Sequence, residues 1–176
     1  MAVPSERRPP RPLNAATLDQ LALRYVERFA TTRGKLADYL RRKIRERGWE
    51  GDLIEPAAVA ERMATLGYVD DRGFAEMRAA ALARRGYGGR RVADALRAAH
   101  VSESDAAIAM EPAAERSIDV ALAFARRRRF GPWGRTAPDD RLRERQVAAM
   151  VRAGHSPALA RRIVVSPPGV PFEGEE

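Results

Sequence analysis

The chain has no cysteine and no long apolar run, and among its 176 residues there are only two histidines and two lysines. Without cysteine there is no disulfide, no thiolate nucleophile and no thiolate metal ligand. No apolar run approaches the roughly 18 residues that a membrane-spanning helix needs. The first residues carry charge and proline with no apolar stretch behind them, unlike a secretory signal. We therefore expect a cytoplasmic protein with no membrane partner.

The chain also lacks a constellation of side chains that suits catalysis. His100 and His155 follow predicted helices with no nucleophile or base beside them, so we interpret both as surface or helix-terminus residues. Asp70–Asp71 and Asp139–Asp140 each precede a predicted helix, where N-capping explains them without a metal ion. The GYGG stretch at Gly86–Gly89 is not followed by the Lys-Ser/Thr of a phosphate-binding loop. The sequence therefore predicts no enzyme, no metal and no cofactor.

Arginine, in contrast, is abundant and clustered. Lys and Arg number 32 against 24 Asp and Glu, which leaves a net charge of +8. Such a charge favours a polyanionic partner: nucleic acid first, an acidic protein surface second and an anionic membrane third. Tyr87, Phe130 and Trp133 lie close to the clusters and offer stacking surfaces, although Tyr87 is equally suited to packing the turn between two helices. The candidate binding residues are Arg41, Arg42, Lys43, Arg84, Arg85, Tyr87, Arg90, Arg91, Arg126, Arg127 and Arg128. Each cluster is explained about equally well as a solvated helix face whose charge is balanced by intervening carboxylates, with no binding role.

Between residues 14 and 165, apolar residues return every three and four positions, with no long alternating β-branched stretch. This periodicity predicts an all-α fold. The same periodicity puts Phe29 and Met77 on buried helix faces. Ser102 is placed to cap the sixth helix. The nine expected helices cover about residues 16–30, 34–47, 56–66, 72–85, 90–99, 102 onward, 113–128, 139–153 and 156 onward. Residues 1–13 and 166–176 are predicted to be a flexible leader and a flexible tail.

Internal repetition groups the nine helices in threes. The stretches IRERGWEGD, LRAAHVSES and MVRAGHSPA align at the end of each middle helix, with an apolar first position and Gly48, His100 and Gly154 at the fifth. A triplicated module is the economical explanation, because neighbouring modules bury the faces that each small core leaves open. We expect a tandem array of three three-helix, helix-turn-helix-like repeats, at residues 14–69, 70–111 and 112–165, in an elongated, curved molecule.

Two stretches resemble signatures of the RecX family. GYVDDRGFA, residues 67–75, resembles its Gly-Tyr-(apolar)-Asp-Asp…Phe-Ala signature. RRGYGGRRVADAL, residues 84–96, resembles its Arg-Gly-Tyr-Gly-Pro-(Arg/Lys)-Arg-Ile…Leu signature, with Gly89 in place of the proline. ALRYVERFATTRGKLADYLRRK, residues 22–43, is similar to the family's opening pair of helices. Weaker similarity extends the resemblance over most of residues 14–165.

The resemblance implies a regulatory protein that controls the RecA recombinase in DNA repair, homologous recombination and the SOS response. Family members lie in the groove of the RecA filament on single-stranded DNA and inhibit its ATP hydrolysis, its extension and strand exchange. The basic residues named above would then contact RecA or DNA, and duplex DNA is left open as a further partner. We expect a monomer. The alternative is a stand-alone basic DNA-binding protein, of the helix-turn-helix or the nonspecific type.

Overall fold

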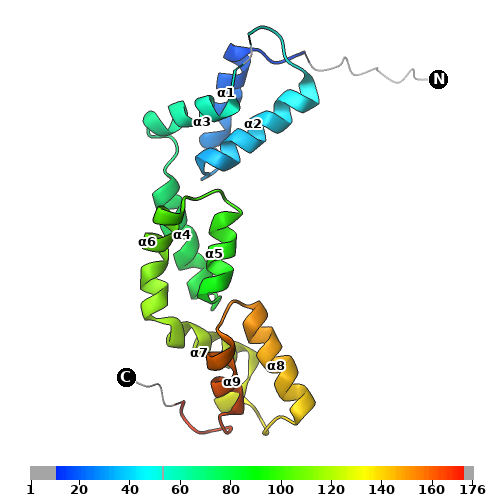
Figure 1. Cartoon of the computed structure of the whole chain (residues 1–176), viewed down its shortest axis with the longest axis vertical. Coiled ribbons are helices and arrows are strands. Elements are labelled where there is room, and N and C mark those ends of the chain that lie inside the picture. The colour runs from blue at the N-terminus through cyan, green and yellow to red at the C-terminus, as the bar shows by residue number, and fades with distance from the viewer. Residues whose placement is uncertain (1–10, 53, 173–176) are drawn as a thin grey trace, which may run out of the picture. The chain divides into compact units, whose positions relative to one another are not determined.

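The structure is a computed structural model that describes residues 11–52 and 54–172. Within these ranges it contains nine α-helices, one short 3₁₀ helix and no β-strand, which confirms the all-α prediction (Figure 1). None of the described helices is long and apolar enough to cross a membrane. The chain divides into two compact units, which we call unit 1, up to Asp71, and unit 2, from Arg72 onward.

Unit 1 packs three helices around one apolar cluster. They are α1 (Ala15–Val26), α2 (Arg33–Arg47) and α3 (Pro56–Thr65). α1 begins with a reciprocal cap, in which the Thr17 N–H donates to the Asn14 side chain and the Asn14 N–H donates to the Thr17 hydroxyl. The largest fully buried side chains of the cluster are Leu13, Leu18, Leu36, Leu40 and Val59.

Unit 2 contains the remaining helices and two apolar clusters. The elements are α4 (Asp71–Arg84, which begins at the last residue of unit 1), α5 (Gly89–Arg97), α6 (Glu103–Glu115), α7 (Ser117–Arg128), η1 (Gly131–Trp133), α8 (Asp140–Arg152) and α9 (Pro157–Val165). One cluster joins α4, α5 and α6, and the other joins α7, α8 and α9. The half-buried ring of Tyr87 packs against both clusters. This contact is the packing role that the sequence left open for Tyr87.

Two predictions about buried faces are wrong. Phe29 is 53 % exposed, because α1 ends at Val26 instead of residue 30 and Phe29 packs from outside against Tyr25. The Tyr25 ring also stacks on that of Tyr39, with the ring centres 4.2 Å apart. Met77 is 51 % exposed, because the buried stripe of α4 runs through Ala75, Ala79 and Leu82, and Met77 lies two residues from its start, on the far side of the helix.

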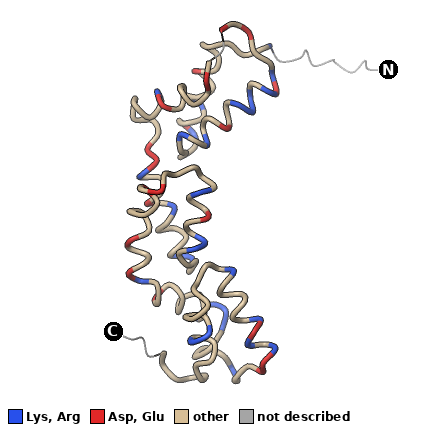
Figure 2. The backbone as a smooth tube through the Cα atoms, in the orientation of Figure 1, with Lys and Arg blue, Asp and Glu red and all other residues tan. Residues whose placement is uncertain are grey.

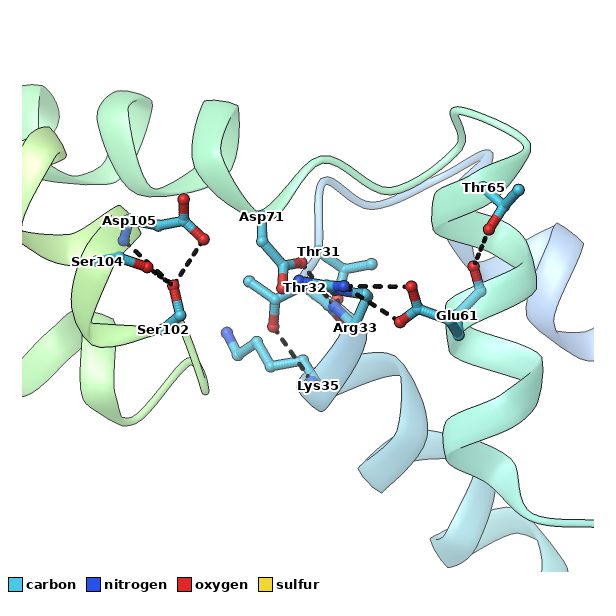
Figure 3. A network of polar contacts seen from close by, with 10 residues as sticks. All are labelled: Thr31, Thr32, Arg33, Lys35, Glu61, Thr65, Asp71, Ser102, Ser104 and Asp105. Carbon is cyan, nitrogen blue, oxygen red and sulfur yellow. Dashed lines mark hydrogen bonds and ion pairs between the residues drawn. The ribbon is translucent and has the colours of Figure 1, made fainter.

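The predicted start of the seventh helix, at residue 113, is also wrong. α6 continues past Pro112 to Glu115, and only Arg116, with φ −105° and ψ 26°, interrupts the helical backbone before α7. At the other end of α6 the prediction is confirmed. The Ser102 hydroxyl accepts a hydrogen bond from the Asp105 N–H at 3.1 Å (Figure 3).

Just after each of the three middle helices, the backbone has a positive φ at the aligned position. Gly48, His100 and Gly154, which align in the sequence, all have positive φ, at 80°, 57° and 97°. Residues other than glycine adopt this left-handed region at a cost, which explains why two of the three aligned positions are glycine. The shared positive φ agrees with the alignment. The division into three repeats stays a prediction.

In unit 1, the carboxylate of Asp71 caps the N-terminus of α2. The carboxylate of Asp71 accepts hydrogen bonds from the Arg33 backbone N–H (2.8 Å) and from Arg33 Nε (3.0 Å), while Arg33 Nη1 reaches Glu61 at 3.1 Å (Figure 3). Arg33 is the first residue of α2, so its N–H has no acceptor within the helix. The hydrogen bond to Asp71 is the main cause that raises the pKa of the Arg33 guanidinium. The Asp71 carboxylate thus serves α2, although Asp71 lies in the first turn of α4.

We predict that Asp71→Ala lowers the free energy of unfolding by about 1–3 kcal/mol, because the Asp71 side chain is 8 % exposed and its loss leaves the Arg33 backbone N–H and Nε without their acceptor. Glu61→Ala removes an exposed partner of the same arginine and should cost less than about 1 kcal/mol. Urea denaturation followed by circular dichroism measures both. Equal losses of unfolding free energy in the two variants would show that the Asp71 contact stabilises the fold no more than the exposed Glu61 contact does.

Candidate functional site

Two turns of unit 2 lie backbone against backbone. The α4–α5 turn comprises residues 85–88, and the α8–α9 turn comprises residues 153–156. The Gly88 N–H donates to the Ala153 carbonyl oxygen at 2.9 Å, and the Arg90 N–H donates to the Gly154 carbonyl oxygen at 3.2 Å. Carbonyl groups at a helix end have no partner within the helix. The α4–α5 turn and the start of α5 therefore supply hydrogen-bond donors to carbonyl oxygens that follow α8.

This contact requires glycine at two positions and not at a third. A Cβ atom on Gly88 would lie 2.4 Å from the Gly154 carbonyl oxygen, and one on Gly154 would lie 2.4 Å from the Arg91 nitrogen. A Cβ atom on Gly89 would meet nothing closer than Met110 Cε, at 3.7 Å. Gly89 is thus the one position of the three where the close approach of the backbones does not demand glycine.

His155 extends the contact between the turns with its side chain. The residue is 6 % exposed, its Nε2–H donates to the Gly86 carbonyl oxygen at 3.0 Å, and its ring lies 5.5 Å from that of Phe124. Burial is the main cause that lowers the pKa of His155, while the bond to Gly86 acts in the opposite direction. The interpretation of His155 as a helix-terminus residue is confirmed, and a surface position is wrong.

The end of α7 brings a second arginine cluster to the α4–α5 turn. Arg127 donates through its guanidinium to the carbonyl oxygens of Arg84, the last residue of α4, and of Arg85, which follows it. A cation suits this place, because it compensates the negative end of the helix dipole. Arg85 in turn lies over the Tyr87 ring, with its Cζ 5.4 Å from the ring centre. Two clusters about 40 residues apart in the sequence therefore meet.

The candidate residues of unit 1 are balanced by carboxylates on their own helix. Arg41 pairs with Asp38 at 2.8 Å, and Arg42 and Lys43 pair with Glu46 at 3.7 Å and 2.6 Å. Figure 2 shows both signs of charge along α2. The Lys43 hydrogen bond is the main cause that lowers the pKa of Glu46. At this cluster the structure matches the description of a charge-balanced, solvated helix face.

The candidate arginines of unit 2 are not balanced in this way. Among the residues that the structure describes, none of them has a carboxylate oxygen within 4.0 Å of a guanidinium nitrogen. All of them are exposed. We call these residues, together with Tyr87, the turn surface: Arg84, Arg85, Tyr87, Arg90, Arg91, Arg126, Arg127 and Arg128. The uncompensated positive charge of the turn surface lies around the two turns in contact.

One further arginine belongs to this region, and sequence reasoning missed it. Arg152, in the last turn of α8, lines a groove of about 310 Å³ together with Arg90 and Arg91. Arg152 is exposed and, within the described ranges, has no carboxylate partner. No signal marks it in the sequence, because it stands alone between apolar residues, and only the contact between the two turns brings it beside α5.

The chain is similar to known regulatory proteins. Residues 70–110 match the family model described as RecX, second three-helix domain. The regulatory protein RecX of Myxococcus xanthus is 32 % identical over 179 residues, which cover 93 % of this chain and 93 % of that protein. The regulatory protein RecX of Agrobacterium fabrum is 27 % identical, over 81 % of this chain and 79 % of that protein.

Two solved structures have the same fold. The crystal structure of RecX from Lactobacillus salivarius superposes with a TM-score of 0.60 at 16 % identity, covering 85 % of this chain and 93 % of that one. A second crystal structure, of a regulatory protein RecX, gives a TM-score of 0.62 at 17 % identity, covering 84 % of this chain and 70 % of that one. At such low identity the similarity concerns the fold alone.

We predict opposite effects for two neighbouring glycines of the turn. Gly88→Ala should lower the free energy of unfolding by about 1–3 kcal/mol, because its Cβ collides with the Gly154 carbonyl group. Gly89→Ala has space for the methyl group at the start of α5 and should leave stability unchanged or raise it by up to about 1 kcal/mol. Urea denaturation midpoints measure both. A Gly88→Ala variant as stable as Gly89→Ala would contradict the close backbone contact.

His155 should make stability depend on pH in a definite direction. Its pKa in the folded chain lies below the ordinary value of 6.5, so below pH 6.5 the unfolded chain takes up the proton first and the free energy of unfolding falls. Denaturation at pH 7.5 and pH 5.5 should show a larger loss for the wild type than for His155→Gln. His100 is present in both proteins and cancels in the comparison. Parallel pH profiles would rule out this role of His155.

Proposed function

The chain belongs to the RecX family of regulatory proteins, and from that premise we propose that it is a non-catalytic negative modulator of the RecA recombinase. In this proposal the protein binds, as a monomer, to the RecA filament on single-stranded DNA in the cytoplasm. It inhibits ATP hydrolysis, filament extension and strand exchange, and so regulates DNA repair and homologous recombination.

The observation that carries the proposal is the uncompensated charge of the turn surface. The chain has 24 acidic residues, and they pair with many of its other arginines, but none lies within ion-pair distance of these seven among the described residues. Exposed like charges repel one another, so the cluster opposes the compact state unless a polyanion binds it. A filament on single-stranded DNA presents such a polyanion along its whole length.

We also propose that the chain is organised as three three-helix repeats, at residues 14–69, 70–111 and 112–165. Three observations support this division: the family model for a three-helix domain matches residues 70–110, the buried apolar residues form three clusters, and the aligned residues Gly48, His100 and Gly154 share a positive φ. An extended array of this kind offers a long surface to a filament.

The test is ATP hydrolysis by RecA on single-stranded DNA while the protein is titrated in. We expect inhibition by the wild type and a rise of about a hundredfold or more in the half-inhibitory concentration for Arg90→Glu/Arg91→Glu, since two charge-assisted contacts are each worth about a factor of ten. Arg41→Glu/Arg42→Glu should cause a smaller rise, because these two charges are already paired on α2.

Arg141→Glu/Arg145→Glu is the matched control, since it makes the same change in net charge on the exposed side of α8, outside the turn surface. It should inhibit like the wild type. Full inhibition by Arg90→Glu/Arg91→Glu would remove the turn surface from the binding site. A wild-type protein that leaves RecA unaffected but binds duplex DNA tightly, with strong salt dependence, would replace the proposal by the stand-alone DNA-binding alternative.

A further inference from the structure

The groove between the beginning of α5 and the end of α8 has three arginines on its walls. It measures about 310 Å³ and is lined by Arg90, Arg91, Asp94, Val151, Arg152 and Gly154. The only carboxylate among these residues, that of Asp94, is engaged by Arg97 at 2.9 Å. The three arginines have no carboxylate partner in the described part of the chain. The groove is therefore strongly positive.

The backbone around the groove does not cancel this charge. A helix that ends at a groove normally presents carbonyl oxygens, which repel anions. At the end of α8, however, the carbonyl oxygen of Met150 accepts from the His155 N–H and that of Val151 from the Gly154 N–H. The Gly154 carbonyl oxygen accepts from the Arg90 N–H, as described above. These bonds leave the three guanidinium groups as the main source of charge in the groove.

The number of arginines indicates which anion the groove suits. A side-chain carboxylate has two oxygens and is satisfied by the fork of one guanidinium. A backbone phosphate presents several oxygens in a tetrahedral arrangement, which two or three guanidinium groups from different directions can bind together. Arg90 and Arg91 come from one helix and Arg152 from another, so the three approach the groove from two sides. Phosphate is thus the better match.

We propose that this groove binds a backbone phosphate of single-stranded DNA, held jointly by Arg90, Arg91 and Arg152. The inference rests on the proposed function, because DNA is a component of the filament, and it adds two statements. It assigns Arg90 and Arg91 to nucleic acid instead of to an acidic face of RecA. It also adds Arg152, so that α5 and α8 both contribute arginines to the phosphate site.

The test is binding of a fluorescent oligodeoxythymidine to the full-length protein without RecA, by anisotropy over a range of salt concentrations. Arg152→Gln should weaken binding about tenfold and reduce the slope of log affinity against log salt by up to about 0.7, the value of one phosphate contact on a single strand. Arg152→Lys keeps the charge and loses the fork, so it should lie between the wild type and Arg152→Gln.

Two controls isolate the groove. Arg161→Gln makes the same charge change at an exposed site of α9 and should bind like the wild type. The effects of Arg91→Gln and Arg152→Gln should be less than additive in the double variant, because both residues hold the same phosphate. An oligonucleotide with an uncharged methylphosphonate backbone should bind weakly and abolish the difference between wild type and variants.

The outcomes separate this inference from the proposed function. Unchanged DNA affinity and salt slope in Arg152→Gln overturn the phosphate assignment. If that variant nevertheless loses RecA inhibition, the groove binds an acidic surface of RecA, and the proposed function stands. If the wild type does not inhibit RecA while Arg152→Gln still lowers DNA affinity, the proposed function fails and the phosphate site stands. Thermal unfolding of each variant confirms that the compared proteins are folded.

Discussion

The hydrogen bonds between the α4–α5 turn and the α8–α9 turn are the constraint on which unit 2 depends. They require that two backbones approach without side chains between them, and Gly88 and Gly154 make this possible. Tyr87 follows from the same geometry, because a turn held in this place sets its ring against both apolar clusters. A contact of a few backbone atoms thus fixes how two groups of helices pack.

The same constraint positions the charges. Arginines from the ends of α4, α7 and α8 and from the start of α5 meet at the turns although they are far apart in the sequence. On α2, by comparison, each candidate cation has an acidic neighbour three or four residues away, as in many exposed helices. The contrast concerns the pairing of charge and not its amount, which is why net charge alone does not locate a binding surface.

The sequence predicts the helices well because their ends carry local signals. Ser102 is an N-cap as its sequence predicts, Asn14 and Ser156 cap α1 and α9 in the same way, and each acts within three residues of itself. Phe29 and Met77 were misplaced for a related reason, since periodicity gives a helix an apolar stripe but does not say where the helix ends or which of two adjacent stripes is buried.

The site is less predictable from sequence than the helices. Its arginine clusters near residues 84–91 and 126–128 are visible as runs, whereas Arg152 and the buried His155 are not. Both are defined by contacts between segments some 60 to 70 residues apart, as the separation of 69 residues between His155 and Gly86 illustrates. No local pattern encodes a partner at that distance.

That separation also has a consequence during synthesis on the ribosome. The α4–α5 turn leaves the ribosome 69 residues ahead of the histidine that binds its Gly86 carbonyl group. At about 5–20 residues per second, the turn waits roughly 3–14 seconds for its partner. Throughout this interval the second apolar cluster at Tyr87 is incomplete, because its α9 residues have not been made. The nascent chain therefore completes the contact between the two turns only when the α8–α9 turn has been made.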